Sequence, residues 1–149
     1  MVKQYCQKLT VAKAKLRVSF NLEPNMKFAS VRLVTNEFER LVTFYQNLSG
    51  IEPMHLADGF AEIRFEGVVL AISSEQLIRN FNVGAAIGAS NRSAILEFQV
   101  DDVDAVSDRM VSTGAEIVLP TTHMPWGNRS LLLRDPDGSL VNVFSKPPR

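Results

Sequence analysis

Residues 93–114, which read SAILEFQVDDVDAVSDRMVSTG, change from an alternating pattern to a helical one. Apolar and polar side chains alternate up to Val100, which is typical of a β-strand with one buried face. After Val100 the apolar residues recur at helical spacing until Gly114, and glycine is common where a helix ends. The stretch therefore predicts a strand followed directly by an α-helix.

Three further strands are predicted after this helix. Runs rich in apolar and β-branched residues occupy 115–120, 130–134 and 140–145. The sequence DPDG at 135–138 separates the last two runs, and aspartate and glycine are typical of tight turns. Residues 93–146 thus predict a unit of one strand, one helix and three strands, which we call a βαβββ module.

The same order of elements is predicted for residues 27–73. KFASVRLVT predicts a strand, and NEFERLVTFYQNLSG predicts a helix that ends at Gly50. Three short strands are expected afterwards, at about 52–57, 60–66 and 68–73. Repetition of a unit that cannot bury its own apolar face implies that the two copies pack on each other.

Two segments lie outside the modules. Residues 1–26 are interpreted as an N-terminal extension, either a flexible one or the product of a start codon upstream of a natural start at Met26. Residues 74–92 contain three glycines and are interpreted as a linker between the modules or a flap over a pocket. The modules and this segment are expected to form one domain.

Composition excludes several classes of function. A chain of 149 residues with 46% hydrophobic content is sufficient for one compact core. Residues 1–25 hold five lysines and arginines and one glutamate, so the zero net charge leaves an acidic body. An acidic body disfavours nucleic-acid binding. The lone Cys6 excludes an internal disulfide, and without a long apolar run we expect a cytoplasmic protein that does not enter a membrane.

The motifs FERLVTFYQNLSG, PWGNRS and DPDGSLVNVF, within two βαβββ modules, resemble the vicinal oxygen chelate superfamily. This superfamily has the glyoxalase, extradiol dioxygenase and bleomycin-resistance fold. The resemblance covers residues 27–146 and implies an α+β fold in which the two modules form a cupped mixed sheet. The family contains both enzymes and pure binders, so the fold alone does not give the function.

The resemblance also implies where a metal would be held, at four positions that usually carry His, Glu or Gln. These positions map to Ser30, Ala71, Ile95 and Asn142. Neither a carboxylate nor an imidazole is among them, and such donors are what divalent metals of these enzymes need. We therefore expect no metal, no cofactor and no catalytic residue. The alternative is a rebuilt metal site that uses Glu97 with His55 or His123.

Successive side chains of a strand point to opposite faces of the sheet, and this alternation, here called parity, predicts which side chains line the cup. Alternation places Val31, Phe98 and Val143 against the helices and their neighbours toward the cup. The predicted ligand-binding residues are Arg32, Ala71, Ile95, Glu97, Gln99, Trp126, Leu140, Asn142 and Phe144. Trp126 is expected either to stack on a ligand or to plug its own loop. Arg32 and Glu97 either face the ligand or pair with each other across the core.

An apolar cup with one amide and one tryptophan is typical of a pocket for an organic ligand. The resemblance is closest to the metal-free bleomycin-resistance type, homodimers that bind a cationic, partly aromatic drug in grooves between subunits. We expect a metal-free protein that sequesters a small organic ligand such as an antibiotic. The alternatives are a metal-dependent lyase, isomerase or dioxygenase with non-standard ligands, and a non-catalytic interaction domain.

Overall fold

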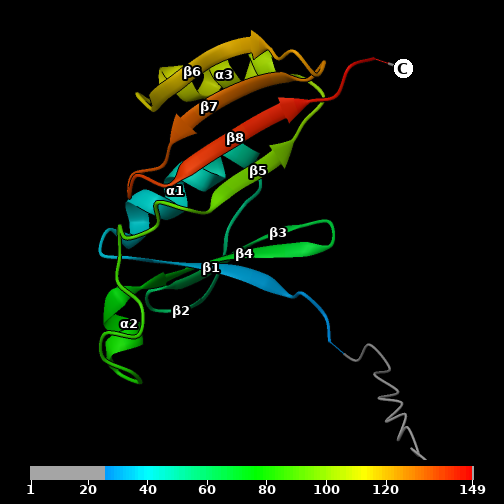
Figure 1. The fold of residues 1–149 in the computed structure, drawn as a ribbon. Helices are drawn as coiled ribbons and strands as arrows, with labels where there is room; N and C mark the ends of the chain where they lie inside the picture. Colours follow the sequence, from blue (N-terminus) through cyan, green and yellow to red (C-terminus); the bar gives the residue numbers. More distant parts are fainter. Residues whose placement is uncertain (1–25, 149) are drawn as a thin grey trace, which may run out of the picture.

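The computed structural model describes residues 26–148 (Figure 1). The N-terminal extension interpreted from the sequence, residues 1–26, lies outside the described part except for Met26. The predicted α+β fold of two βαβββ modules is confirmed, and the strands form two four-stranded mixed sheets. No helix within the described residues is long and apolar enough to cross a membrane.

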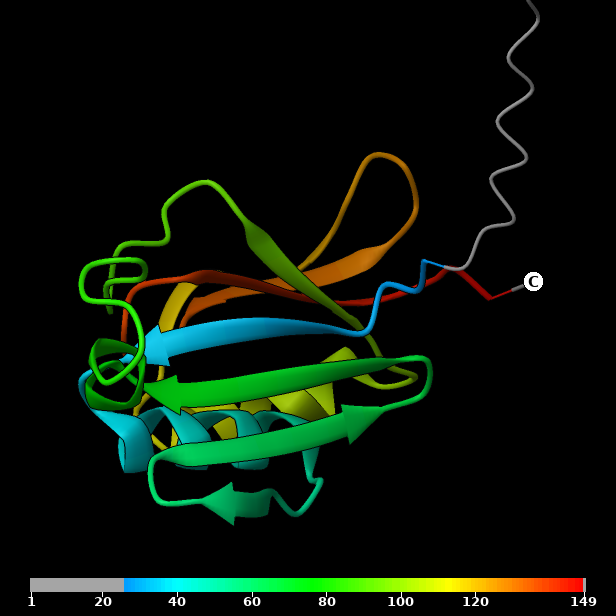
Figure 2. The same cartoon turned by 90° about the horizontal axis from the view of Figure 1, so that it is seen from below.

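The first module forms a sheet in the order β1-β4-β3-β2, with β1 parallel to β4 and the other pairs antiparallel. Its elements are β1 (Ser30–Thr35), α1 (Phe38–Ser49), β2 (Met54–Ala57), β3 (Phe60–Phe65) and β4 (Val68–Ser74). Figure 2 shows the open face of this sheet, with α1 behind it and β1 at its edge. The helix ends at Gly50, whose φ of 70° lies in the left-handed region that glycine tolerates.

The second module repeats this order as β5-β8-β7-β6, again with one parallel pair, β5 and β8. Its elements are β5 (Ile95–Gln99), α3 (Val103–Ser112), β6 (Glu116–His123), β7 (Arg129–Arg134) and β8 (Leu140–Ser145). The first strand of each module, β1 or β5, is thus an outer strand. In Figure 1, β5 is the strand of its sheet that lies nearest to the first module.

The segment between the modules contains a short helix, α2 (Glu75–Arg79), that the sequence analysis did not predict. Ser74 caps it by accepting a hydrogen bond from the backbone N–H of Leu77 at 3.2 Å. The far end of the segment is fixed to the first module, because Glu75 accepts hydrogen bonds from Asn36 at 2.8 Å and from the N–H of Gly88 at 3.0 Å. These bonds lower the pKa of Glu75, with the Gly88 bond as the largest cause.

A single apolar core runs through both modules, and Tyr45 of α1 lies at its centre with no exposed surface. The hydroxyl of Tyr45 donates to Oδ2 of Asp135 at 2.8 Å, and its ring packs against Phe98 of β5. Asp135 begins the predicted DPDG turn, and its Oδ1 accepts the N–H groups of Asp137 and Ser139. Burial raises the pKa of Tyr45 well above its ordinary value, so the hydroxyl remains a donor.

Tyr45→Phe is expected to lower the free energy of unfolding by about 1–2 kcal/mol, because the buried carboxylate of Asp135 loses a donor. Urea unfolding monitored by circular dichroism measures this. The matched control is Ser112→Ala, since Ser112 donates to a carbonyl at an exposed helix end and should change stability by less than about 0.5 kcal/mol. Equal effects of the two substitutions would contradict the structural role of Tyr45.

Candidate functional site

The open face of the second sheet carries several of the predicted ligand-binding residues. Along β8, Val141 and Val143 are fully buried toward the helices, while Leu140, Asn142 and Phe144 alternate with them and are half-buried. This alternation has the parity that the sequence indicated. On β5, Ile95, Glu97 and Gln99 are exposed. Asn142 lies beside Glu97, because the two residues are partners in the β5–β8 register.

A cavity of about 430 Å³ lies between β1 and β5, and we call it the β1–β5 groove. It brings together three of the predicted residues, Arg32, Ile95 and Glu97. Its walls are mainly apolar and include Val31, Leu33, Phe65, Val69, Ile95 and Phe98. Arg32 and Glu97 are the two charged residues that line it. A cavity of this size with apolar walls and few polar groups is typical of a small-molecule site.

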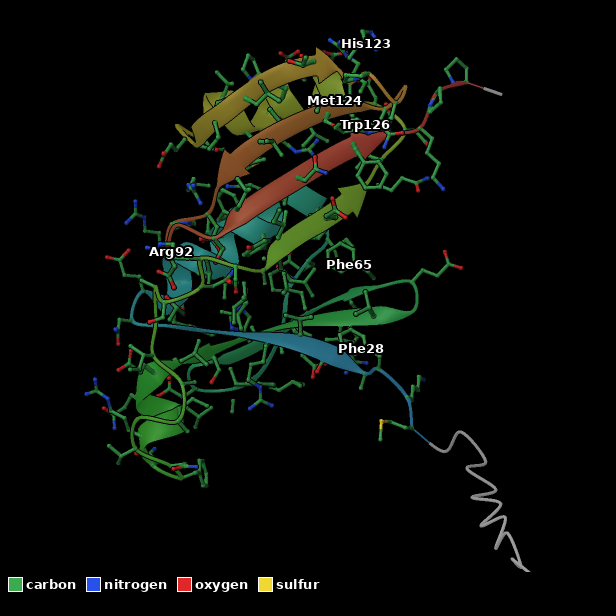
Figure 3. The ribbon with its side chains drawn as sticks, in the orientation of Figure 1. Phe28, Phe65, Arg92, His123, Met124 and Trp126 are labelled. Atoms are coloured by element: carbon green, nitrogen blue, oxygen red, sulfur yellow. The ribbon has the colours of Figure 1, made fainter. Side chains whose placement is uncertain are left out.

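A second cavity of about 650 Å³ shares the side chains of Phe65, Glu97 and Phe98 with the β1–β5 groove and adds Gln99. The rings of Phe65 and Phe98 are 5.4 Å apart between their centroids. Figure 3 shows Phe65 at the end of β3, between the two sheets. Glu97 therefore lies where the two cavities meet, beside an aromatic pair contributed by both modules.

The carboxylate of Glu97 is held in place but not neutralised. Its Oε1 accepts a hydrogen bond from Nδ2 of Asn142 at 2.9 Å. Within residues 26–148, none of the ion pairs includes Glu97 or Arg32. The guanidinium carbon of Arg32 instead lies 4.9 Å from the ring centroid of Phe60 on β3. Arg32 and Glu97 therefore do not pair with each other in the structure, which was one of the two expectations for them.

Asn142 has one amide atom without a partner. Its Oδ1 is buried and accepts no hydrogen bond from the described residues. The amide is oriented by Glu97, because the reverse orientation would place two acceptors against each other. An unsatisfied buried acceptor costs about 1–3 kcal/mol. A buried polar atom without a partner calls for an explanation, and a binding role of the Glu97–Asn142 pair supplies one, so this pair is a candidate binding group.

The remaining predicted residues lie outside the two cavities. Ala71 is 2% exposed in the middle of the first sheet, next to Arg32 in the β1–β4 register. Leu140, Asn142 and Phe144 lie on the open face of the second sheet and line neither cavity, although Asn142 contacts Glu97, which lines both. Trp126 is 67% exposed, so it does not plug its own loop (Figure 3).

Parity did not identify the aromatic part of the groove. It assigned Val31 and Phe98 to the helix side, yet Val31 is 38% exposed and both residues line the β1–β5 groove. The reason is that β1 and β5 are outer strands, where side chains of the helix face reach the gap between the sheets. Alternation tells the face on which a side chain lies, whereas an outer strand is recognised from the strand order of its sheet, which alternation does not reveal.

The residues do not fit a metal ion. Ser30, Ala71 and Ile95 offer no carboxylate or imidazole, and Asn142 offers only a neutral amide oxygen. Within the described part of the chain, three His, Cys, Asp or Glu side chains do not come together anywhere in a group able to bind a metal. His55 instead packs edge-on against Phe38, with 6.0 Å between ring centroids. A rebuilt site around Glu97 and His55 or His123 therefore lacks the necessary donors.

The sequence of this chain was compared with protein families and with known proteins. Residues 27–143 match the family model described as glyoxalase/bleomycin resistance protein/dioxygenase superfamily. The protein YraH of Bacillus subtilis (strain 168) is 25% identical over 128 residues, which are 80% of this chain and 98% of YraH.

Two solved structures have a similar fold. The crystal structure of a glyoxalase/bleomycin resistance protein/dioxygenase from Nocardioides is 26% identical, with a TM-score of 0.66 over 82% of this chain and 84% of that one. A glyoxalase-related enzyme from Fulvimarina pelagi is 23% identical, with a TM-score of 0.70 over 81% and 88% of the two chains. The second likeness is one of fold alone.

Asn142→Leu is expected to raise the free energy of unfolding by about 1 kcal/mol, because it removes the unsatisfied buried acceptor and keeps the side-chain volume. Chemical unfolding in urea measures the change. Leu132→Asn serves as the converse control, since Leu132 is the partner of Asn142 on β7 and half-buried; it should destabilise. A loss of stability in Asn142→Leu would show that Asn142 is required for the fold.

Proposed function

Because the chain belongs to the glyoxalase/bleomycin resistance protein/dioxygenase superfamily, we propose that it binds a small organic molecule in the β1–β5 groove without a metal ion. The observation that carries this proposal is the carboxylate of Glu97, which is oriented by Asn142 and has no cationic partner within residues 26–148. This exposed carboxylate stands on a mainly apolar wall, where a positive group placed beside it forms a charge-assisted hydrogen bond. The ligand therefore carries a cationic group at this end.

The apolar walls favour an aromatic ligand. Phe65 and Phe98 stand beside Glu97 with their rings tilted by 51°, so a flat ring can pack against them. Aromatic contacts of this kind contribute about 0.5–1.5 kcal/mol beyond the burial of their surface. A cationic aromatic drug combines both features. We propose that the protein sequesters such a molecule, for example an antibiotic, in the cytoplasm.

We also propose that the protein is a homodimer. Strands β2 and β6 end their sheets, and a strand edge presents unpaired N–H and C=O groups that favour pairing. Met54 and Leu56 on β2 expose about half of their surfaces, as does Val118 on β6. Apolar side chains at exposed edges are typical of surfaces that a second copy covers.

Ligand binding is tested with a panel of cationic aromatic dyes, namely ethidium, acriflavine and rhodamine 6G, titrated into the full chain by isothermal calorimetry. At least one dye should bind, and Glu97→Gln should weaken it roughly tenfold, because a charge-assisted contact is lost. Glu116→Gln is the matched control, since Glu116 is an exposed glutamate on β6 outside the β1–β5 groove. Binding that is unaffected by Glu97→Gln would contradict the site.

The same protein, incubated with Zn²⁺, Ni²⁺, Mn²⁺ or Fe²⁺ and then dialysed, should retain less than about a tenth of an equivalent of each ion, because it lacks the donors of a tight site. Elemental analysis by mass spectrometry measures the content. If the unmodified protein retained one full equivalent of a metal ion and the Glu97→Gln variant lost it, the metal-free proposal would be overturned and a metal-dependent enzyme favoured.

The dimer is tested by sedimentation equilibrium at micromolar concentration, where the mass should be twice that of the chain. Leu56→Glu on β2 should shift the equilibrium toward the monomer, because a charge would be buried in an apolar contact. A monomer in the unmodified protein would exclude this part of the proposal.

A further inference from the structure

The charges of the β1–β5 groove point to a ligand with both a cationic and an anionic group. We propose that the ligand is amphoteric: an aromatic body whose cationic end contacts Glu97 and whose anionic end contacts Arg32. This inference rests on the proposed function, since it concerns the same groove. It adds the second charge of the ligand and assigns a residue to it.

Arg32 and Glu97 occupy equivalent places in the two modules. Arg32 is the partner of Ala71 in the parallel pair β1–β4, and Glu97 is the partner of Asn142 in the parallel pair β5–β8. Both side chains are exposed, and both line the groove. The two walls of one groove thus carry opposite charges at matching positions.

Each charge is oriented by its own module, which keeps the two apart. The guanidinium of Arg32 lies over the ring of Phe60 at 4.9 Å, and the carboxylate of Glu97 is held by Asn142 at 2.9 Å. A guanidinium that stacks through its face keeps the N–H donors at its edge, and these match a carboxylate or phosphate group in geometry. Arg32 therefore remains able to bind an anion.

A ligand with a single positive charge can pair with only one of the two charged side chains of the groove. It would neutralise Glu97 but would leave Arg32, on the other wall of the same cavity of about 430 Å³, without an anionic partner from residues 26–148. A ligand with an anionic group at its opposite end gains a second charge-assisted contact. The apolar walls between the two charges, such as Val69 and Ile95, fit an uncharged ring system.

Four naphthalene probes test the inference, because they share one ring system and differ only in charge. They are 6-(aminomethyl)-2-naphthoic acid, 2-naphthylmethylamine, 2-naphthoic acid and 2-methylnaphthalene, each titrated into the full chain by isothermal calorimetry. The amphoteric acid should bind roughly tenfold more tightly than the amine, which corresponds to one charge-assisted contact. The amine in turn should bind more tightly than the uncharged hydrocarbon.

Substitutions assign each charge to its residue. Arg32→Gln should bring the affinity for the amphoteric probe down to that for the amine, and leave the amine itself bound at least as tightly. Arg64→Gln is the matched control, because Arg64 is an exposed arginine of the same sheet, paired with Glu62 at 2.9 Å and outside the groove. It should change no affinity in the series.

The outcomes separate this inference from the proposed function. If the amine binds as tightly as the amphoteric probe and depends on Glu97, the amphoteric ligand is overturned and the proposed function is retained. If the amphoteric probe still binds more tightly than the amine in the Arg32→Gln variant, Arg32 is not the anion-binding residue and the inference fails. If none of the probes binds, this inference and the proposed β1–β5 site both fall.

Discussion

The hydrogen bond between Tyr45 and Asp135 connects two parts of the chain that are 90 residues apart. It is buried, and it fixes helix α1 of the first module against the turn between β7 and β8 of the second. Because the ring of Tyr45 also packs on Phe98, the same contact positions β5. The distance between β1 and β5, and with it the shape of the groove, depends on how α1 lies between the sheets. Arg109 adds to this by donating to the backbone carbonyls of Asn47 and Leu48 at the end of α1.

Local patterns predicted the modules because each strand and helix has one apolar face. The alternation at Val141 and Val143 and the glycine at each helix end follow from side-chain periodicity and backbone sterics, which are properties of short segments. Helix α2 was missed because it is only five residues long and follows its capping residue Ser74 in a glycine-containing linker. Short helices carry little periodicity, so their caps are the main signal.

The geometry of the candidate site was predicted only in part, for a different reason. Glu97 and Asn142 were identified because they share a face of one sheet, which parity can tell. Phe65 and Phe98 were not, because they meet between two sheets whose relative placement depends on contacts far apart in the sequence. The lack of a carboxylate or imidazole at the four positions that the family resemblance indicates could be read from the sequence. The sequence alone could not tell whether Arg32 and Glu97 pair with each other, because pairing depends on which partners lie nearest to each side chain in the folded chain.

The separate anchoring of the two charges has a consequence for how recognition can change. Arg32 is held by an aromatic ring of its own sheet, and Glu97 by an amide of its own sheet. Neither support contains residues of the other module. A substitution at one wall can therefore reverse the polarity of that wall without disturbing the other. In the proposed site, the two modules thus supply oppositely charged walls that single substitutions can change separately, around apolar side chains from both modules.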